Sequence, residues 1–156
     1  MPKNEIEKQY YEIKKKYTLP EFKELDSEFE ISDLEETNFL LRAIVRRIAE
    51  KLDFYSTMLE EILQPDTSNL YAMHETRFFD EKEKNQMYDL YRKLMNYNRQ
   101  SIEVSIKNDE RELTDFITSF FSIWVSLKNE LLRFVKTMKN SWETETDVKE
   151  DLRYLG

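Results

Sequence analysis

Glycine is almost missing from this sequence, which has a single one at Gly156. Glycine adopts positive φ without a steric penalty, so tight turns and phosphate-binding loops usually depend on it. Its scarcity excludes the glycine-dependent nucleotide motifs. Cysteine is absent and histidine occurs once, at His74, so disulfide frameworks and Cys/His zinc sites are excluded as well. A chain with so few turn-forming residues favours long helices joined by short polar connections.

Long apolar runs are also missing. The longest candidate, 116–127, is interrupted by serine and threonine and is shorter than the ~20 residues that cross a bilayer. The N-terminal stretch 1–16 is charged and does not resemble a signal peptide. The net charge of −8 is unlike that of a typical nucleic-acid-binding domain. We expect a cytoplasmic protein that does not associate with membranes.

The first strong helical pattern is a stripe of apolar residues from Leu34 to Ile62 that repeats about every three to four residues. Ser32 and Glu35 have the spacing of a capping box at its start, and Pro65 ends it. The one polar member of the stripe is Asn38, which could fix the register between helices. The pattern predicts a helix over 33–64.

Two further long helices follow. Asp80 and Glu83 form a second capping box, which opens a helix over 81–107. A turn at 108–109 leads to a helix over 110–140, and so short a connection makes the two helices antiparallel neighbours. With an N-terminal helix and short connecting helices, these elements predict an all-α antiparallel helical bundle. We expect one domain over 1–142 and an acidic, mobile tail over 143–156.

The helix over 110–140 has apolar residues around most of its circumference. A helix of this kind is usually buried on all sides. We therefore expect it to be either the central helix of the bundle or one half of a homodimer interface, and the first arrangement is favoured.

The segment 18–32 is an acidic connector with regularly spaced apolar residues, among them Phe22, Leu25 and Phe29. Such a segment could bind a basic, grooved protein partner. Alternatively, its apolar residues pack on the chain's own helices while the acidic residues face water. The second interpretation is favoured, because a compact domain holds its connectors in place.

Four basic residues lie together in the helix predicted over 33–64. Arg42 and Arg46 are four residues apart and share one face, and Arg47 and Lys51 share the adjacent face. They could bind phosphate groups or an acidic partner. A solvated face paired with nearby carboxylates is the favoured interpretation, because the chain as a whole is acidic.

Catalytic and metal-binding constellations are not evident. His74 has Tyr71, Glu75 and Arg77 nearby, but no nucleophile or oxyanion donor accompanies them. We therefore expect a partly exposed structural histidine, no catalytic residue, no metal and no cofactor. An all-carboxylate cation site in the acidic connector would lack the EF-hand spacing.

Three functional hypotheses remain. The favoured one is a non-enzymatic adaptor, assembly subunit or inhibitor that binds another protein, or a second copy of itself, through helical faces and acidic segments. The first alternative is a nucleic-acid-associated factor that uses Arg42, Arg46, Arg47 and Lys51. The second is an enzyme or small-ligand binder with a pocket near His74.

Overall fold

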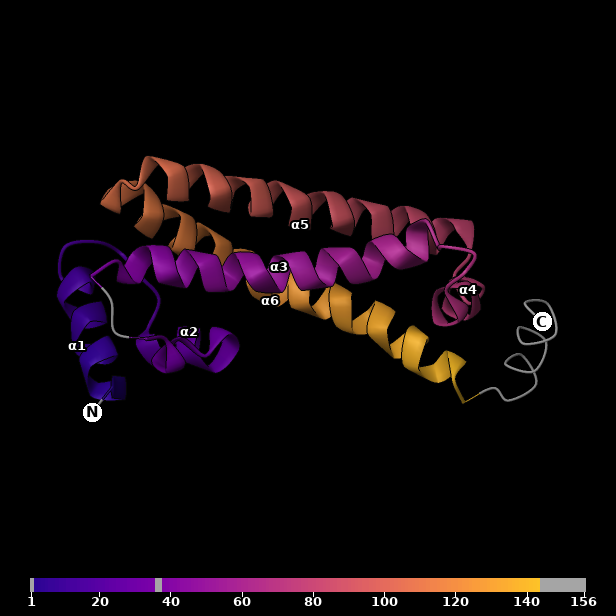
Figure 1. The fold of residues 1–156 in the computed structure, drawn as a ribbon, viewed down its shortest axis with the longest axis horizontal. Coiled ribbons are helices and arrows are strands. Elements are labelled where there is room, and N and C mark those ends of the chain that lie inside the picture. The colour runs from indigo at the N-terminus through magenta and orange to yellow at the C-terminus, as the bar shows by residue number, and fades with distance from the viewer. Residues whose placement is uncertain (1, 36–37, 144–156) are drawn as a thin grey trace. The chain divides into compact units, whose positions relative to one another are not determined.

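The protein is all-α. The structure, a computed structural model, describes residues 2–35 and 38–143, and within them it has six α-helices, one short 3₁₀ helix and no strand (Figure 1). This confirms the predicted fold class. The tail expected to be mobile lies, from residue 144 onward, outside the described residues. The elements are α1 (Pro2–Lys14), α2 (Phe22–Phe29), η1 (Ile31–Asp33), α3 (Leu40–Leu63), α4 (Leu70–Thr76), α5 (Glu81–Lys107) and α6 (Glu110–Ser141).

The chain forms two compact units. The first comprises Met1–Leu52 and Asn96–Val125, and the second comprises Asp53–Met95 and Ser126–Gly156. The three long helices, α3, α5 and α6, each contribute one segment to each unit. The single domain expected over 1–142 remains a prediction, and each unit is described separately below.

The first unit contains α1, α2 and η1, together with the beginning of α3, the end of α5 and the beginning of α6. Its core is aromatic: the Phe29 ring lies 5.9 Å from Phe120 and 5.4 Å from Trp124, centroid to centroid. The Asn98 side chain on α5 donates to the carbonyl of Ala49 on α3. Tyr97 on α5 meets Phe120 on α6, with ring centroids 5.6 Å apart.

The second unit contains α4 and the remaining segments of α3, α5 and α6. Phe79 and Phe134 are buried and meet with ring centroids 6.2 Å apart. Gln86 on α5 accepts a hydrogen bond from Arg133 on α6. Thr76 donates to the carbonyl of Ile62, which ties α4 to the end of α3.

The helix ends show how the chain turns without glycine. Glu30 and Asn108 both adopt the left-handed conformation, each with φ of 54°. The expected capping box at Asp80 and Glu83 is confirmed in both directions, because each side chain accepts from the other's backbone amide. Asp109 likewise caps α6 by accepting from the amide of residue 112.

The start of α3 differs from the prediction. The helix begins at Leu40 rather than at residue 33, so Leu34 and Asn38 do not belong to it. The expected capping box at Ser32 is not formed, because the amide of Ser32 donates to the Asp26 carboxylate 2.7 Å away. Leu34 is extended, with ψ of 146°. The Ser32 amide is therefore engaged by Asp26, six residues earlier, and this contact closes the connector after α2 in place of the predicted capping box.

The expectation that α6 is buried on nearly all sides is wrong for the described structure. Leu113, Phe120, Trp124 and Phe134 are buried, but Val125 is 59% and Leu132 58% exposed. Too few elements surround the helix to cover its full circumference. Whether this face takes part in a homodimer remains a prediction.

Candidate functional site

The apolar residues of the acidic connector are part of the core of the first unit. Phe22, Leu25 and Phe29 are all buried, with at most 4% of each side chain exposed. Two acidic residues of the connector hold it in place. Asp26 accepts a hydrogen bond from the Ser32 amide, and Glu28 accepts one from the indole of Trp124. Packing on the chain's own helices is therefore the arrangement found, and these three side chains are not accessible to a partner.

Two of the four basic residues on α3 are committed to the same connector. Arg47 donates to the carbonyls of Phe29 and Glu30, at 3.2 and 3.0 Å. Lys51 donates to the carbonyl of Glu28 at 2.6 Å and lies 5.5 Å from the centre of the Phe29 ring. The last carbonyls of a helix lack intrahelical partners and carry partial negative charge. Arg47 and Lys51 therefore cap the C-terminal end of α2.

Arg42 and Arg46 lie on a different face of α3. The guanidinium of Arg42 is 5.7 Å from the ring centre of Phe39. Arg46 is exposed and makes no hydrogen bond or ion pair with the residues that the structure describes. The predicted division of the four cations into two faces is thus found, and only this face is not used to hold the fold together.

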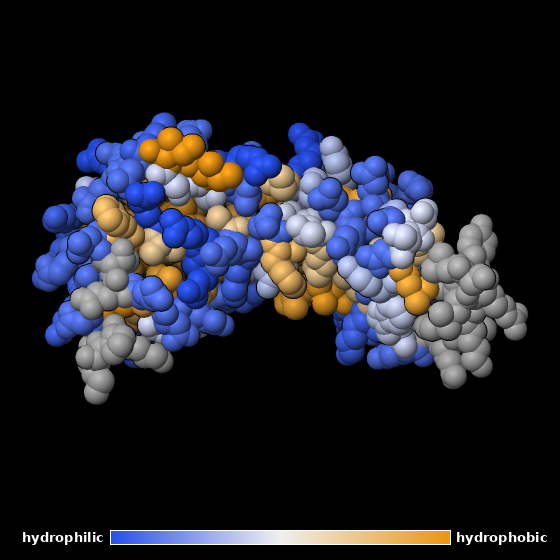
Figure 2. All heavy atoms as spheres, viewed as in Figure 1, coloured by the Kyte–Doolittle hydropathy of each residue, from blue (hydrophilic) through white to orange (hydrophobic). Residues whose placement is uncertain are grey.

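A groove of about 300 Å³ runs between this face of α3 and the end of α5. Its walls are Arg42 and Arg46 on one side and Ile102 and Ile106 on the other. Its remaining lining residues have small side chains, which leave the hollow open: Ala49, Ser101 and Ser105. Ile102 is 45% and Ile106 79% exposed. Figure 2 shows hydrophobic side chains at the surface beside hydrophilic ones where α5 ends. We call these seven residues the α3–α5 groove.

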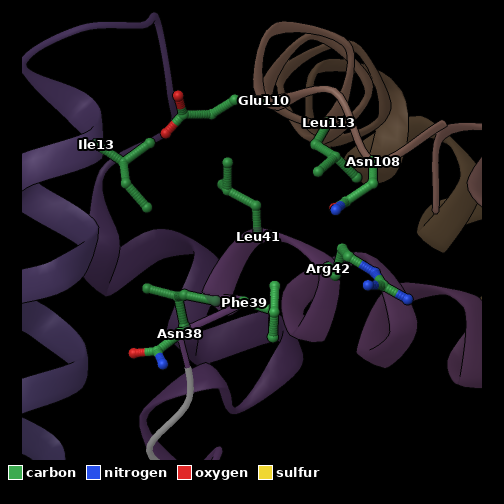
Figure 3. A pocket seen from close by; sticks show the side chains of 9 residues that line it. Ile13, Asn38, Phe39, Leu41, Arg42, Asn108, Glu110 and Leu113 are labelled. Atoms are coloured by element: carbon green, nitrogen blue, oxygen red, sulfur yellow. The ribbon is translucent and has the colours of Figure 1, made fainter.

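A second, smaller pocket of about 130 Å³ shares Arg42 with the groove. Ile13, Leu41 and Leu113 form its apolar centre (Figure 3). Phe39, Leu40 and four polar or charged residues complete its lining: Asn38, Arg42, Asn108 and Glu110. Small-molecule sites usually measure about 300–1,000 Å³, so this pocket is undersized for a cofactor. It extends the partly apolar surface next to the groove.

His74 is buried, so the expectation that it is partly exposed is wrong. Its side chain is fully buried, and Nε2 lies 2.9 Å from the carbonyl oxygen of Ser141. Its ring lies 4.2 Å from that of Trp142, centroid to centroid. The neighbouring polar side chains have other partners, since Tyr71 donates to Glu61 and Glu75 accepts from Trp142. His74 therefore helps to hold α4 against the end of α6.

In the part of the chain that the structure describes, no group of three histidine or acidic side chains could hold a metal ion. The second unit has a hollow of about 560 Å³, but His74 does not line it. That hollow is lined by carboxylates, a lysine and two tyrosines, and Tyr91 donates to Glu60 within it.

Among 2–35 and 38–143, no helix is long and apolar enough to span a membrane.

The sequence predictions missed the isoleucines of the groove. The buried positions at this end of α5 are Leu94, Asn98 and Ser101, at spacings of four and three residues. Ile102 and Ile106 are four residues apart and lie off that stripe. In the sequence, this apolar pair outside the expected buried stripe of the helix could have indicated an exposed apolar surface.

Comparisons with known proteins give no assignment. No family model, no curated protein and no solved structure matches this chain.

Proposed function

We propose that this protein is a non-enzymatic recognition protein that binds another protein through the α3–α5 groove of its first unit. The observation that carries the proposal is the contrast among the four cations of α3. Arg47 and Lys51 hold α2, whereas Arg46 has no partner among the described residues and borders exposed isoleucines. An apolar surface rimmed by polar groups is typical of protein interaction sites.

The nucleic-acid alternative is less well supported. Of the four basic residues on which it depends, two donate to backbone carbonyls of the chain itself. A phosphate backbone would also gain little from Ile102 and Ile106, because nucleic-acid affinity comes mainly from cations and aromatic stacking.

The proposal is tested by purifying the tagged full-length protein from its host and identifying what co-purifies. We expect protein partners with the wild type that are lost from Ile106→Asp. Val125→Asp is the matched control, because Val125 is also exposed, lies in the same unit and does not line the groove. Identical recovery with Ile106→Asp, or recovery of nucleic acid in place of protein, contradicts the proposal. A partner that is a second copy of the chain would identify the interaction as homodimerisation.

A further inference from the structure

The α3–α5 groove has two chemically different walls, each one helical turn long. On α3, Arg42 and Arg46 are four residues apart, and on α5 so are Ile102 and Ile106. Four residues of α-helix rise about 6 Å, so each pair follows one turn of its helix. The contact between Asn98 and Ala49 holds α3 and α5 together at this point. A basic row and an apolar row therefore run side by side along the same groove.

The charge of the groove is entirely positive. Its seven lining residues include two arginines and no carboxylate. The nearest acidic residue in sequence to the two isoleucines is Glu103, and it pairs with Lys107 at 3.3 Å. The two arginines give the groove lining a positive charge, whereas the chain as a whole carries a net charge of −8. An acidic ligand is therefore attracted to the groove.

From this arrangement we propose that the α3–α5 groove binds an amphipathic acidic helix of a partner protein. The helix places apolar side chains at positions i and i+4 against Ile102 and Ile106. It places carboxylates along the neighbouring face, against Arg42 and Arg46. Carboxylates pair with arginine through two parallel hydrogen bonds, which adds directional specificity to the apolar contact. This inference rests on the proposed function and specifies the chemistry of the partner.

A second copy of this chain fits the groove poorly in a symmetric dimer. A two-fold interface places the same surface on both subunits. Two α3–α5 grooves facing each other would bring Arg42 and Arg46 of one copy towards their counterparts in the other. Like charges brought together at an interface are unfavourable, so the groove favours a partner of opposite charge.

The probe for the test is a synthetic peptide of about four helical turns, a length at which isolated helices begin to form. It carries leucines at i and i+4 with glutamates along the adjacent face. The matched peptide has lysines in place of the glutamates, and a third has the glutamates but alanines in place of the leucines. Binding of each to the full-length protein is measured by fluorescence anisotropy.

We expect the acidic amphipathic peptide to bind and both control peptides to bind at least about tenfold more weakly. Ile102→Ser with Ile106→Ser should weaken binding of the acidic peptide by about tenfold or more. Arg42→Gln with Arg46→Gln should weaken it to a similar extent and reduce its salt dependence. Val125→Ser should leave the binding of the acidic peptide unchanged. Circular dichroism checks that each variant remains folded.

Three outcomes of the peptide measurements overturn the inference. Equal binding of the lysine peptide shows that the groove accepts apolar helices of any charge, and the proposed function then stands without the acidic partner. Binding that is unaffected by the isoleucine and arginine variants places the peptide elsewhere on the protein. If the acidic peptide fails to bind at all, the inference fails, and the co-purification experiment decides separately whether the proposed function fails with it.

A single-stranded RNA oligonucleotide is measured in parallel. The RNA result contradicts both the inference and the proposed function if the wild type binds the RNA tightly, the arginine variant does not bind it, and the isoleucine variant binds it as tightly as the wild type.

Discussion

Two faces of the first half of α3 carry the same chemistry and have different surroundings. Arg47 and Lys51 meet the carbonyl end of α2, where each forms hydrogen bonds to the backbone. Arg42 and Arg46 instead border small side chains and exposed isoleucines of α5. The spacing of four residues defines both faces equally well. What differs is the element that packs beside each face, so the role of a cation depends on its neighbours.

The largest effect should come from Phe29, the aromatic residue beside Arg47 and Lys51. Phe29→Ala removes a fully buried ring that meets Phe120, Trp124 and the ammonium of Lys51. We expect the free energy of unfolding to fall by about 3–5 kcal/mol, measured by chemical denaturation. Phe39→Ala, at an exposed ring, is the control and should cost far less. Equal losses would mean that α2 is not part of the core.

Arg47→Gln and Arg46→Gln compare the two faces directly. Arg47→Gln removes charged donors from two carbonyls at the end of α2, and we expect a loss of about 1.5–3 kcal/mol. Arg46→Gln removes the same charge from an exposed position, and we expect a change within about 0.5 kcal/mol. Thermal and chemical unfolding of both variants measure the difference. Similar values for the two would erase the distinction between the faces.

Asp26→Ala tests the hydrogen bond that closes the connector after α2, where Arg47 and Lys51 also bind. Asp26 accepts a hydrogen bond from the Ser32 amide, and we expect its removal to cost about 1 kcal/mol. Asp33→Ala is the matched control, because the Asp33 side chain is exposed and forms no hydrogen bond or ion pair with the described residues. Hydrogen exchange of the Ser32 amide should accelerate in the first variant alone. A protected Ser32 amide in Asp26→Ala would argue against the role of this contact.

Glu30→Gly should produce the smallest change in the free energy of unfolding. It should be more stable than its matched alanine variant, whereas the substitutions above destabilise the protein. Glu30 has φ of 54°, a conformation that glycine adopts without penalty, and Arg47 bonds to its carbonyl rather than its side chain. We expect stabilisation of up to about 1 kcal/mol relative to Glu30→Ala, which removes the same carboxylate but keeps the steric cost. The midpoint of denaturant unfolding measures it. If the alanine variant is as stable as the glycine variant, the left-handed conformation carries no cost here.

The sequence predicted the helices well where the information is local. The reciprocal cap at Asp80 and Glu83 and the turn at 108–109 depend on residues within a few positions of each other, and both are found. The start of α3 could not be predicted in the same way. Its capping pattern at Ser32 is overridden by Asp26, whose position depends on where α2 ends.

The sequence predicted the arginine wall of the α3–α5 groove but not its isoleucine wall. The spacing of Arg42 and Arg46 identified their shared face, but it could not show that Arg47 would be drawn to the end of α2. Ile102 and Ile106 become visible as a surface only once the buried stripe of α5 is known. Burial against another element is a property of tertiary packing, which periodicity in one helix does not contain.

The contacts of the connector also fix when the first unit can be completed during synthesis. Thr18 accepts from Thr118, and Glu28 accepts from Trp124, across separations of 100 and 96 residues. At about 5–20 residues per second, a ribosome needs roughly 5–20 s to make the chain between such partners. During that interval α2 has been synthesised while its aromatic neighbours on α6 do not yet exist. We expect its phenylalanines to be open to chaperones until α6 emerges.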